Sequence, residues 1–94
     1  MFMAMNKDEA VAKSRADLAG RLGVSESEIK VDSIEDADFP DANFGASDAD
    51  ELSAQMITPG WRIRLSAGRD SYEYRANRNR LRLFNFKGSN YRVA

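Results

Sequence analysis

The chain has 94 residues, 43% hydrophobic and 31% charged, so it is long enough for one domain and too apolar for a disordered chain. It contains no cysteine and no histidine, which excludes disulfides, thiolate zinc sites and histidine-based catalysis or pH sensing. The first residues lack the pattern of a secretory signal, and no apolar run approaches the roughly 18 residues of a membrane helix. We therefore expect a cytoplasmic protein.

The net charge of −1 conceals two oppositely charged halves. Residues 1–60 hold 5 basic and 13 acidic side chains, a balance of −8, and residues 61–94 hold 9 basic and 2 acidic side chains, a balance of +7. From Asp32 to Glu51 there are eight acidic residues and no basic one. Such asymmetry can mark a surface that binds a partner.

Residues 7–22 are predicted to form a helix. Asn6 and Glu9 have the spacing of a capping box, and Gly23 suits a left-handed C-terminal cap. Larger side chains recur at helical spacing beside a row of alanines, which would let the helix lie close to a sheet. The larger positions are Val11, Arg15, Leu18 and Leu22, and the alanines are Ala12, Ala16 and Ala19.

A short helical turn and a strand are predicted next. Ser25 and Glu28 repeat the capping spacing. The strand begins at about Ile29, with a bulge near Ser33 where the apolar alternation slips, and it ends before Pro40.

Between residues 40 and 60 the sequence indicates turns and loops. Pro40 and Asp41 suit the centre of a type I turn. Residues 46–53 predict an acidic loop, residues 54–57 a short apolar strand, and the Thr-Pro-Gly of residues 58–60 a type II turn.

The clearest signal is a β-hairpin, in which WRIRLSA and SYEYRAN alternate around the turn GRD. One face would hold Trp61, Ile63, Leu65, Tyr72, Tyr74 and Ala76. NRN is predicted as the next turn and LRLFNF as the last strand. Residues 1–94 thus form a single α+β domain, with one N-terminal helix packed on a three- to five-stranded antiparallel sheet. We expect residues 1–5 and 88–94 to be frayed tails.

Several of these segments resemble a small uncharacterised prokaryotic α+β domain family. The resemblance rests on the helix end RLGV, the FPD…G corner, TPGW and YEYR, and it covers about residues 10–76. The family is similar to PepSY-type domains, which implies a compact helix-plus-sheet module that inhibits or regulates proteases. The resemblance brings no catalytic residue. Many relatives carry export signals or lipoprotein anchors, from which this chain departs, so the resemblance leaves the compartment open.

The segment FPDANFG, residues 39–45, is either a recognition loop or a structural corner. As a recognition loop it would present Asp41, Asn43 and Phe44. As a corner, its proline and glycine would set backbone angles, its aspartate would bond its own turn, and its phenylalanines would plug the sheet edge. We favour the corner, built from Phe39, Pro40, Asp41, Asn43 and Gly45.

The acidic run offers carboxylates for calcium, but residues 48–51 lack the glycine and the downstream glutamate of an EF-hand loop. The alternation instead places Asp32, Asp36 and Asp38 on the solvent face of a strand. We expect no metal site.

The predicted register turns a row of arginines and two phenylalanines to the face opposite the apolar side chains: Arg62, Arg64, Arg75, Arg80, Arg82, Phe84 and Phe86. Single-stranded RNA binders use such faces, but the chain has no RNP-like sequence and its pI is about 5.4. The alternative is that the arginines pair with Asp32, Asp36 and Asp38. A bulge at residues 83–84 would then return the phenylalanines to the core or to a dimer interface. We favour this alternative because the two charge blocks nearly cancel.

No nucleophile has a base at a recognisable spacing, so we expect no enzyme, no catalytic residue and no cofactor. The leading hypothesis is a non-enzymatic interaction or regulatory module, inhibitor-like, that contacts another protein or a second copy through an open sheet face or strand edge. The alternatives are a weak single-stranded nucleic-acid binder and a ligand pocket between helix and sheet; no membrane partner is expected. The candidate binding residues are Trp61, Arg62, Arg64, Arg75, Arg82, Phe84 and Phe86.

Overall fold

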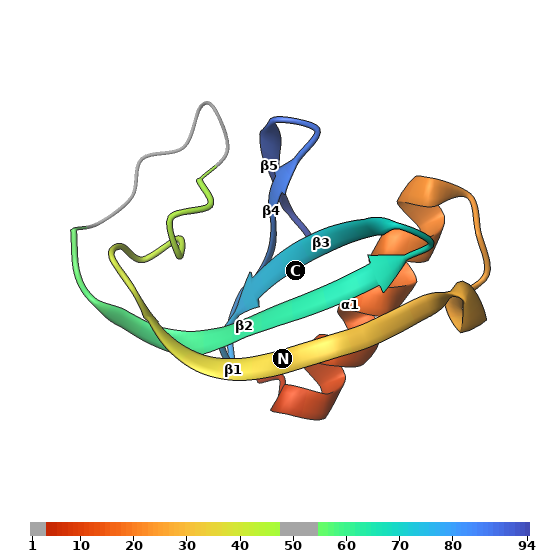
Figure 1. The fold of residues 1–94 in the computed structure, drawn as a ribbon. Coiled ribbons are helices and arrows are strands. Elements are labelled where there is room, and N and C mark those ends of the chain that lie inside the picture. The colour runs from red at the N-terminus through yellow and green to blue at the C-terminus, as the bar shows by residue number, and fades with distance from the viewer. Residues whose placement is uncertain (1–3, 48–54) are drawn as a thin grey trace.

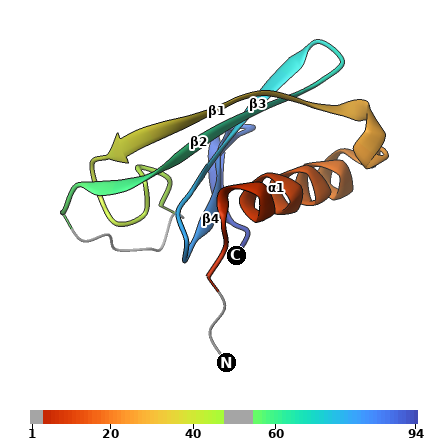
Figure 2. The same ribbon diagram turned by 90° about the horizontal axis from the view of Figure 1, so that it is seen from below.

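The computed structural model describes residues 4–47 and 55–94. Helix α1 (Lys7–Leu22) and the 3-10 turn η1 (Glu26–Glu28) precede five strands, which are β1 (Ile29–Phe39), β2 (Thr58–Ala67), β3 (Asp70–Ala76), β4 (Leu81–Phe86) and β5 (Ser89–Arg92). The strands form one antiparallel sheet in the order β1-β2-β3-β4-β5 (Figure 1). Helix α1 lies across one face of it (Figure 2). The predicted α+β fold, one helix on an antiparallel sheet, is confirmed.

The predicted ends of α1 are confirmed. Asn6 and Glu9 form a reciprocal capping box, and Gly23 closes the helix in the left-handed conformation at φ 69°. Of the alanines predicted to face the sheet, Ala19 is buried, but Ala12 and Ala16 are exposed, so the prediction is wrong for these two.

The buried stripe of α1 is built around Ala10, Ser14 and Leu18 instead. The Ser14 hydroxyl donates to the Ala10 carbonyl at 2.7 Å, so this buried polar group has a hydrogen-bond partner within the helix. Sequence periodicity gave no weight to a serine in this stripe.

The core lies between α1 and the helix-facing side of the sheet. Its fully buried large members are Leu18, Ile63, Leu65, Tyr74, Leu81 and Leu83. The hairpin register places Trp61 opposite Ala76, Ile63 opposite Tyr74 and Leu65 opposite Tyr72, as the alternation predicted.

A hydrogen bond ties α1 to β3, and its acceptor, Asp17, also forms an ion pair within α1. The Tyr74 hydroxyl and Arg21 Nε both donate to Asp17 Oδ2 at 2.7 Å. Burial, reinforced by the bond to Asp17, raises the pKa of Tyr74 well above its ordinary value. Burial lowers the pKa of Arg21, but the hydrogen bond and charge of Asp17 outweigh that effect and raise it.

Strand β1 contains the predicted bulge, because its register with β2 shifts between Val31 and Ser33. The predicted turn at residues 58–60 is wrong, since this segment is the start of β2. Pro59 is tolerated there because β3 ends opposite Trp61, which leaves Pro59 with a strand neighbour on the β1 side alone. Residues 55–57 of the predicted apolar strand are not in a strand. Residue 54 of that strand and residues 48–53 of the predicted acidic loop lie outside the described residues.

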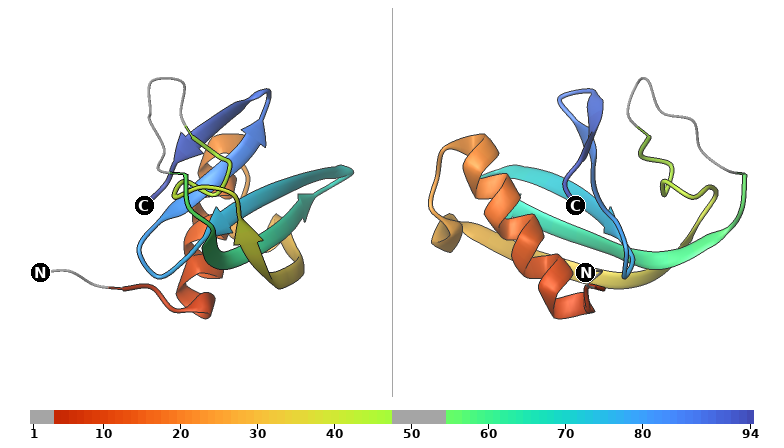
Figure 3. Two further views of the ribbon diagram at one scale, coloured as in Figure 1. Left: turned by 90° about the vertical axis from the view of Figure 1, so that its left-hand side faces the viewer. Right: turned by 180° about the vertical axis from the view of Figure 1, so that it is seen from behind.

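The C-terminal tail is not frayed. Residues 89–92 form β5, and beyond it the Leu81 N–H donates to the Ala94 carbonyl at 2.8 Å. The β4–β5 turn has Lys87 at φ 52° and Gly88 at φ 86°, the paired positive angles of a tight hairpin. This hairpin turns away from the layer formed by β1, β2 and β3 (Figure 3).

The predicted N-terminal tail is docked at Met5, whose side chain is buried and whose N–H donates to the Arg78 carbonyl at 2.7 Å. Residues 1–3 of that predicted tail lie outside the described residues. Within the described residues, no helix combines the length and apolar composition needed to cross a membrane.

Candidate functional site

The segment of residues 39–47, called the corner below, packs on the sheet face opposite α1. The rings of Phe39 and Phe44 are buried, with centroids 5.3 Å apart, and Ala46 is buried beside them. The corner therefore covers part of a sheet face, whereas we expected it to plug an edge. This small second core needs no residue of α1.

Asp41 bonds its own turn, as the corner interpretation requires. Its Oδ1 accepts from the N–H groups of Asn43 at 2.9 Å and Gly45 at 3.1 Å. The hydrogen-bonded turns begin at Asp41 and Asn43 rather than being centred on Pro40 and Asp41 as predicted. Phe44 adopts φ 62°, a left-handed conformation that bulky residues avoid, so the surrounding contacts hold it there.

Glu73 is the centre of the basic face. Its carboxylate accepts from Arg75 Nε at 2.6 Å and Arg62 Nε at 3.3 Å, and Arg64 Nε lies at 3.7 Å. Arg75 also donates to the Phe44 carbonyl at 2.8 Å, which links the cluster to the corner. Three of the candidate binding arginines therefore already pair with one carboxylate of their own chain.

Arg80 and Arg82, which flank the start of β4, also donate hydrogen bonds to the corner. Arg82, expected to face solvent, is 5% exposed, and its guanidinium donates to Asn43 Oδ1 at 3.2 Å. Arg80 donates to the same oxygen and to the Ala42 carbonyl. The burial of Arg82 depends on the tertiary structure, because its hydrogen-bond partner Asn43 is distant from β4 in the sequence.

The two phenylalanines of β4 lie on opposite faces, which corrects the prediction that both share the basic face. Phe84 stays on the basic face opposite Glu73, with the Arg75 guanidinium carbon 3.5 Å from its ring centroid. Asn85 then adopts φ 52° and shifts the register, so Phe86 turns to the helix side and packs on Tyr72. The irregularity lies at Asn85 rather than at the predicted residues 83–84, and it returns Phe86, but not Phe84, to the main core.

The expected pairing of the arginines with Asp32, Asp36 and Asp38 is wrong. Asp36 pairs with Lys7 at 3.3 Å, and Asp32 accepts from the Ser66 hydroxyl at 3.0 Å. Asp38 is exposed and forms no ion pair with another residue of the described part. The arginines are directed instead to Glu73 and to acceptors of the corner.

Strand β1 is the outer strand of the sheet on the acidic side. It pairs with β2 along its length, and no described residue pairs with its other side. After the bulge, residues 33–39 match residues 64–58 one for one, which leaves a regular edge. Its exposed side chains include Ile34, Glu35, Asp36 and Asp38.

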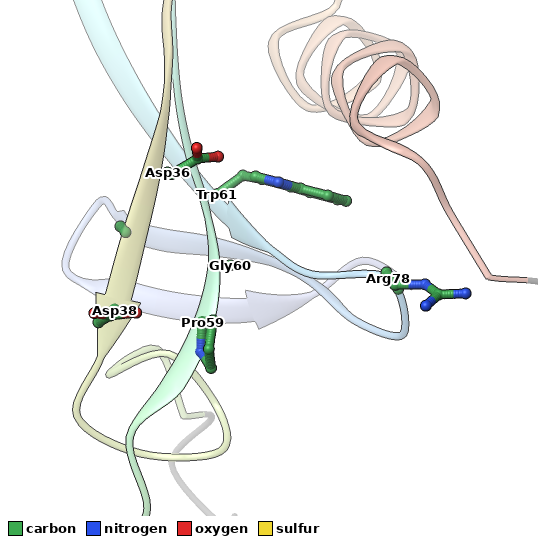
Figure 4. Close-up of a pocket in the computed structure, with 7 residues that line it drawn as sticks. Asp36, Asp38, Pro59, Gly60, Trp61 and Arg78 are labelled. Atoms are coloured by element: carbon green, nitrogen blue, oxygen red, sulfur yellow. The ribbon is translucent and has the colours of Figure 1, made fainter.

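An open hollow of about 440 Å³ adjoins this edge on the helix-facing side. Figure 4 shows Asp36 and Asp38 at one side of it, the Trp61 indole extending across it, and Arg78 at the far rim. Trp61 is half-buried and packs partly on the main core, so it does not share the basic face with Arg62 and Phe84. The lining consists of Asp36, Ala37, Asp38, Pro59, Gly60, Trp61 and Arg78.

The structure brings the candidate residues into two groups rather than one. The arginines and Phe84 gather around Glu73 and the corner, whereas Trp61 lies with the acidic edge. Sequence reasoning missed Glu73 as the shared partner and β1 as the open edge. The acidity of residues 32–38 was the available signal for that edge. Among residues 4–47 and 55–94, no group of acidic side chains is placed to hold a metal ion.

No curated protein and no solved structure matches the chain. A family described as a domain of unknown function (DUF8738) matches residues 11–84, which run from within α1 to Phe84 in β4 and include the corner and the β1 edge. The similarity to PepSY-type domains stays a prediction. Because the match covers most of the sequence, the chain belongs to the DUF8738 family of domains of unknown function.

Proposed function

We propose that this chain is a non-enzymatic interaction module that binds an extended segment of another protein along the outer edge of β1. A regulatory or inhibitor-like role would follow if that segment belongs to an enzyme. The observation that carries the proposal is the regular edge of residues 33–39, paired with β2 on one side alone among the described residues. Such an edge offers backbone N–H and C=O groups to an added strand.

The two faces of the sheet are less suited to a partner. Helix α1 covers one of them, and the corner with its arginines occupies much of the other. A strand added at the edge of β1 would not require α1 or the corner to move, and it would extend the existing sheet.

The edge also favours a different protein over a second copy of this chain. Asp32, Glu35, Asp36 and Asp38 line β1, and two such strands side by side would bring like charges together. Like charges are a feature by which edge strands avoid pairing with copies of themselves.

Three hydroxyl groups, those of Ser14, Ser25 and Tyr74, are held in structural contacts, which supports a non-enzymatic role. Ser14 donates to a carbonyl inside the helix contact, and Ser25 belongs to the capping network of η1. The Tyr74 hydroxyl is bound to Asp17 within the core. Each of these groups has a structural partner.

The alternative, weak binding of single-stranded nucleic acid on the basic face, has less support. Stacking platforms need open aromatic rings, but Arg75 lies on the Phe84 ring and Phe86 faces the other side. Glu73 and the corner already engage the arginines.

An amide NMR titration of the full chain tests the proposal against this alternative. Seven-residue peptides selected from a random library should shift the amides of residues 33–39 and slow their hydrogen exchange. A mixed single-stranded RNA should leave those amides unchanged at physiological salt. Peptide shifts confined to other surfaces, or salt-sensitive RNA shifts over residues 62–84 without any peptide binding, would reject strand addition in favour of the alternative.

A further inference from the structure

The edge of β1 has a side-chain pattern as well as a free backbone. We propose that its partner is a basic segment that adds antiparallel to β1, with basic residues opposite Asp38 and Asp36 and an apolar residue opposite Ile34. This inference rests on the proposed function and adds the chemistry of the partner. The first basic side chains would enter the hollow beside Trp61.

The alternation of β1 places these three side chains on one face. Ile34, Asp36 and Asp38 lie opposite Ile63, Trp61 and Pro59 of β2, and directly opposite residues share a face. A strand added on the outer side would continue the same rows. Its alternate residues would therefore meet one apolar and two acidic neighbours.

The hollow suits a long cationic side chain. The Asp36 and Asp38 carboxylates stand at its outer side, and the Trp61 indole lies across it (Figure 4). A lysine or arginine could lay its aliphatic stem on the ring and place its charge at the carboxylates. The Arg78 guanidinium points away from both carboxylates, so it does not neutralise them (Figure 4).

The existing partner of Asp36 can be replaced. The Lys7–Asp36 pair is 3.3 Å long, and its side chains are 44% and 84% exposed, so it is a surface pair of small net stability. A partner cation would enter this pair or displace it. Asp38 has no ion pair within the described part of the chain, so it is open to the second cation.

The apolar position follows from Ile34. This side chain lies opposite Ile63 on the helix-facing side of the sheet but remains 36% exposed. An apolar residue across from it would remove the exposed surface from water. Read from its N-terminus, the antiparallel partner therefore has the order basic, any, basic, any, apolar.

Three matched peptides test this order. The first is Thr-Lys-Thr-Lys-Thr-Ile-Thr. The second, Thr-Lys-Thr-Ile-Thr-Lys-Thr, has the same composition and alternation but mismatches the edge in both strand directions. The third replaces both lysines of the first by glutamate.

Because Trp61 is the only tryptophan of the chain, its emission reports directly on the hollow. The first peptide should shift this emission and bind about tenfold more tightly than the second, while the third should not bind. The protein variant Asp36→Asn/Asp38→Asn should lose this preference. Asp70→Asn, which removes an exposed carboxylate at the start of β3, is the matched control and should keep it.

The outcomes separate the two proposals. If both lysine peptides bind equally and shift the amides of residues 33–39 without changing Trp61 emission, strand addition stands and the basic pattern is wrong. If no peptide shifts those amides, the proposed function fails and the pattern fails with it. If sedimentation shows that the chain dimerises through β1 and excludes the peptides, a second copy is the occupant and the pattern is rejected.

Discussion

The basic face and the acidic edge of this sheet carry opposite charges, and they differ in how many of those charges have partners within the described part of the chain. On the basic face, arginines share Glu73, donate to carbonyl and amide oxygens of the corner, and lie on aromatic rings. On the acidic edge, Asp36 has one exposed lysine partner, and Asp38 has none among the described residues.

A near-zero net charge does not show which charges pair. The acidic and basic halves of the sequence nearly cancel, which suggested that they neutralise each other. The fold instead directs most of the arginines to neutral acceptors and a local glutamate. The acidic strand is consequently left as the open electrostatic feature.

The largest expected effect comes from removing a buried ring of the corner, which packs on the basic face. Phe39→Ala removes a ring that is 1% exposed and packs on Phe44, so the free energy of unfolding should fall by about 3–5 kcal/mol. Ile57→Ala removes a side chain that is 73% exposed and should change stability by less than about 0.5 kcal/mol. Urea unfolding of both variants measures the contrast, and equal effects would show that the corner is not packed on the sheet.

The second effect tests how closely β3 and the Phe39 ring approach Gly60 of β2. A Cβ on Gly60 would lie 2.3 Å from the Ala76 carbonyl oxygen and 3.2 Å from the Phe39 ring, so Gly60→Ala should destabilise by about 1–3 kcal/mol. Gly20→Ala is the control, because it meets open space on α1 and should stabilise by about 0.5–1 kcal/mol. Thermal unfolding should therefore move in opposite directions for the two variants, and a shift of the same sign would contradict this packing.

The third effect tests whether Glu73 holds the basic face together. Glu73→Gln keeps the shape but leaves three arginines without a shared charge, so stability should fall by about 1–2 kcal/mol. The same variant should bind single-stranded RNA more tightly at low salt than the wild type does. Anisotropy titrations at two salt concentrations measure this, and unchanged RNA binding would mean that the corner, rather than Glu73, limits access to the arginines.

The fourth effect concerns the helix-covered face. Tyr74→Phe removes the bond to Asp17 and should cost about 1 kcal/mol at pH 7. Because the folded state raises the pKa of Tyr74, it holds the phenolic proton more tightly than the unfolded state does. The contribution of Tyr74 is complete below about pH 10 and falls by up to about 1.4 kcal/mol per pH unit above it. The stability difference between wild type and variant should therefore shrink from pH 10 to pH 11, and a constant difference would be contrary evidence.

The smallest effect on stability belongs to the acidic edge. Lys7→Ala removes the exposed partner of Asp36 and should change the free energy of unfolding by less than about 0.5 kcal/mol. It should nonetheless strengthen binding of the basic peptide, because the Asp36 carboxylate loses its competitor. Lys13→Ala, on an exposed position of α1, is the matched control and should change neither property. Weaker peptide binding by Lys7→Ala would place the cation elsewhere.

Local sequence signals determined much of the fold. The capping box at Asn6, the left-handed Gly23, the bulge near Ser33 and the alternating hairpin each depend on residues close together in the chain, so short-range rules predicted them. Strand β5 was missed although Lys87 and Gly88 provide its turn, because the sequence after them alternates weakly.

Only the tertiary structure decided the surfaces. Whether Arg82 is buried depends on Asn43, and whether Phe84 is open depends on Arg75, pairs that local patterns do not relate. The partners of the charges follow from which strands are neighbours and from where the corner folds. The sequence by itself determined an acidic strand and a basic hairpin, and long-range packing left the first open while it enclosed much of the second.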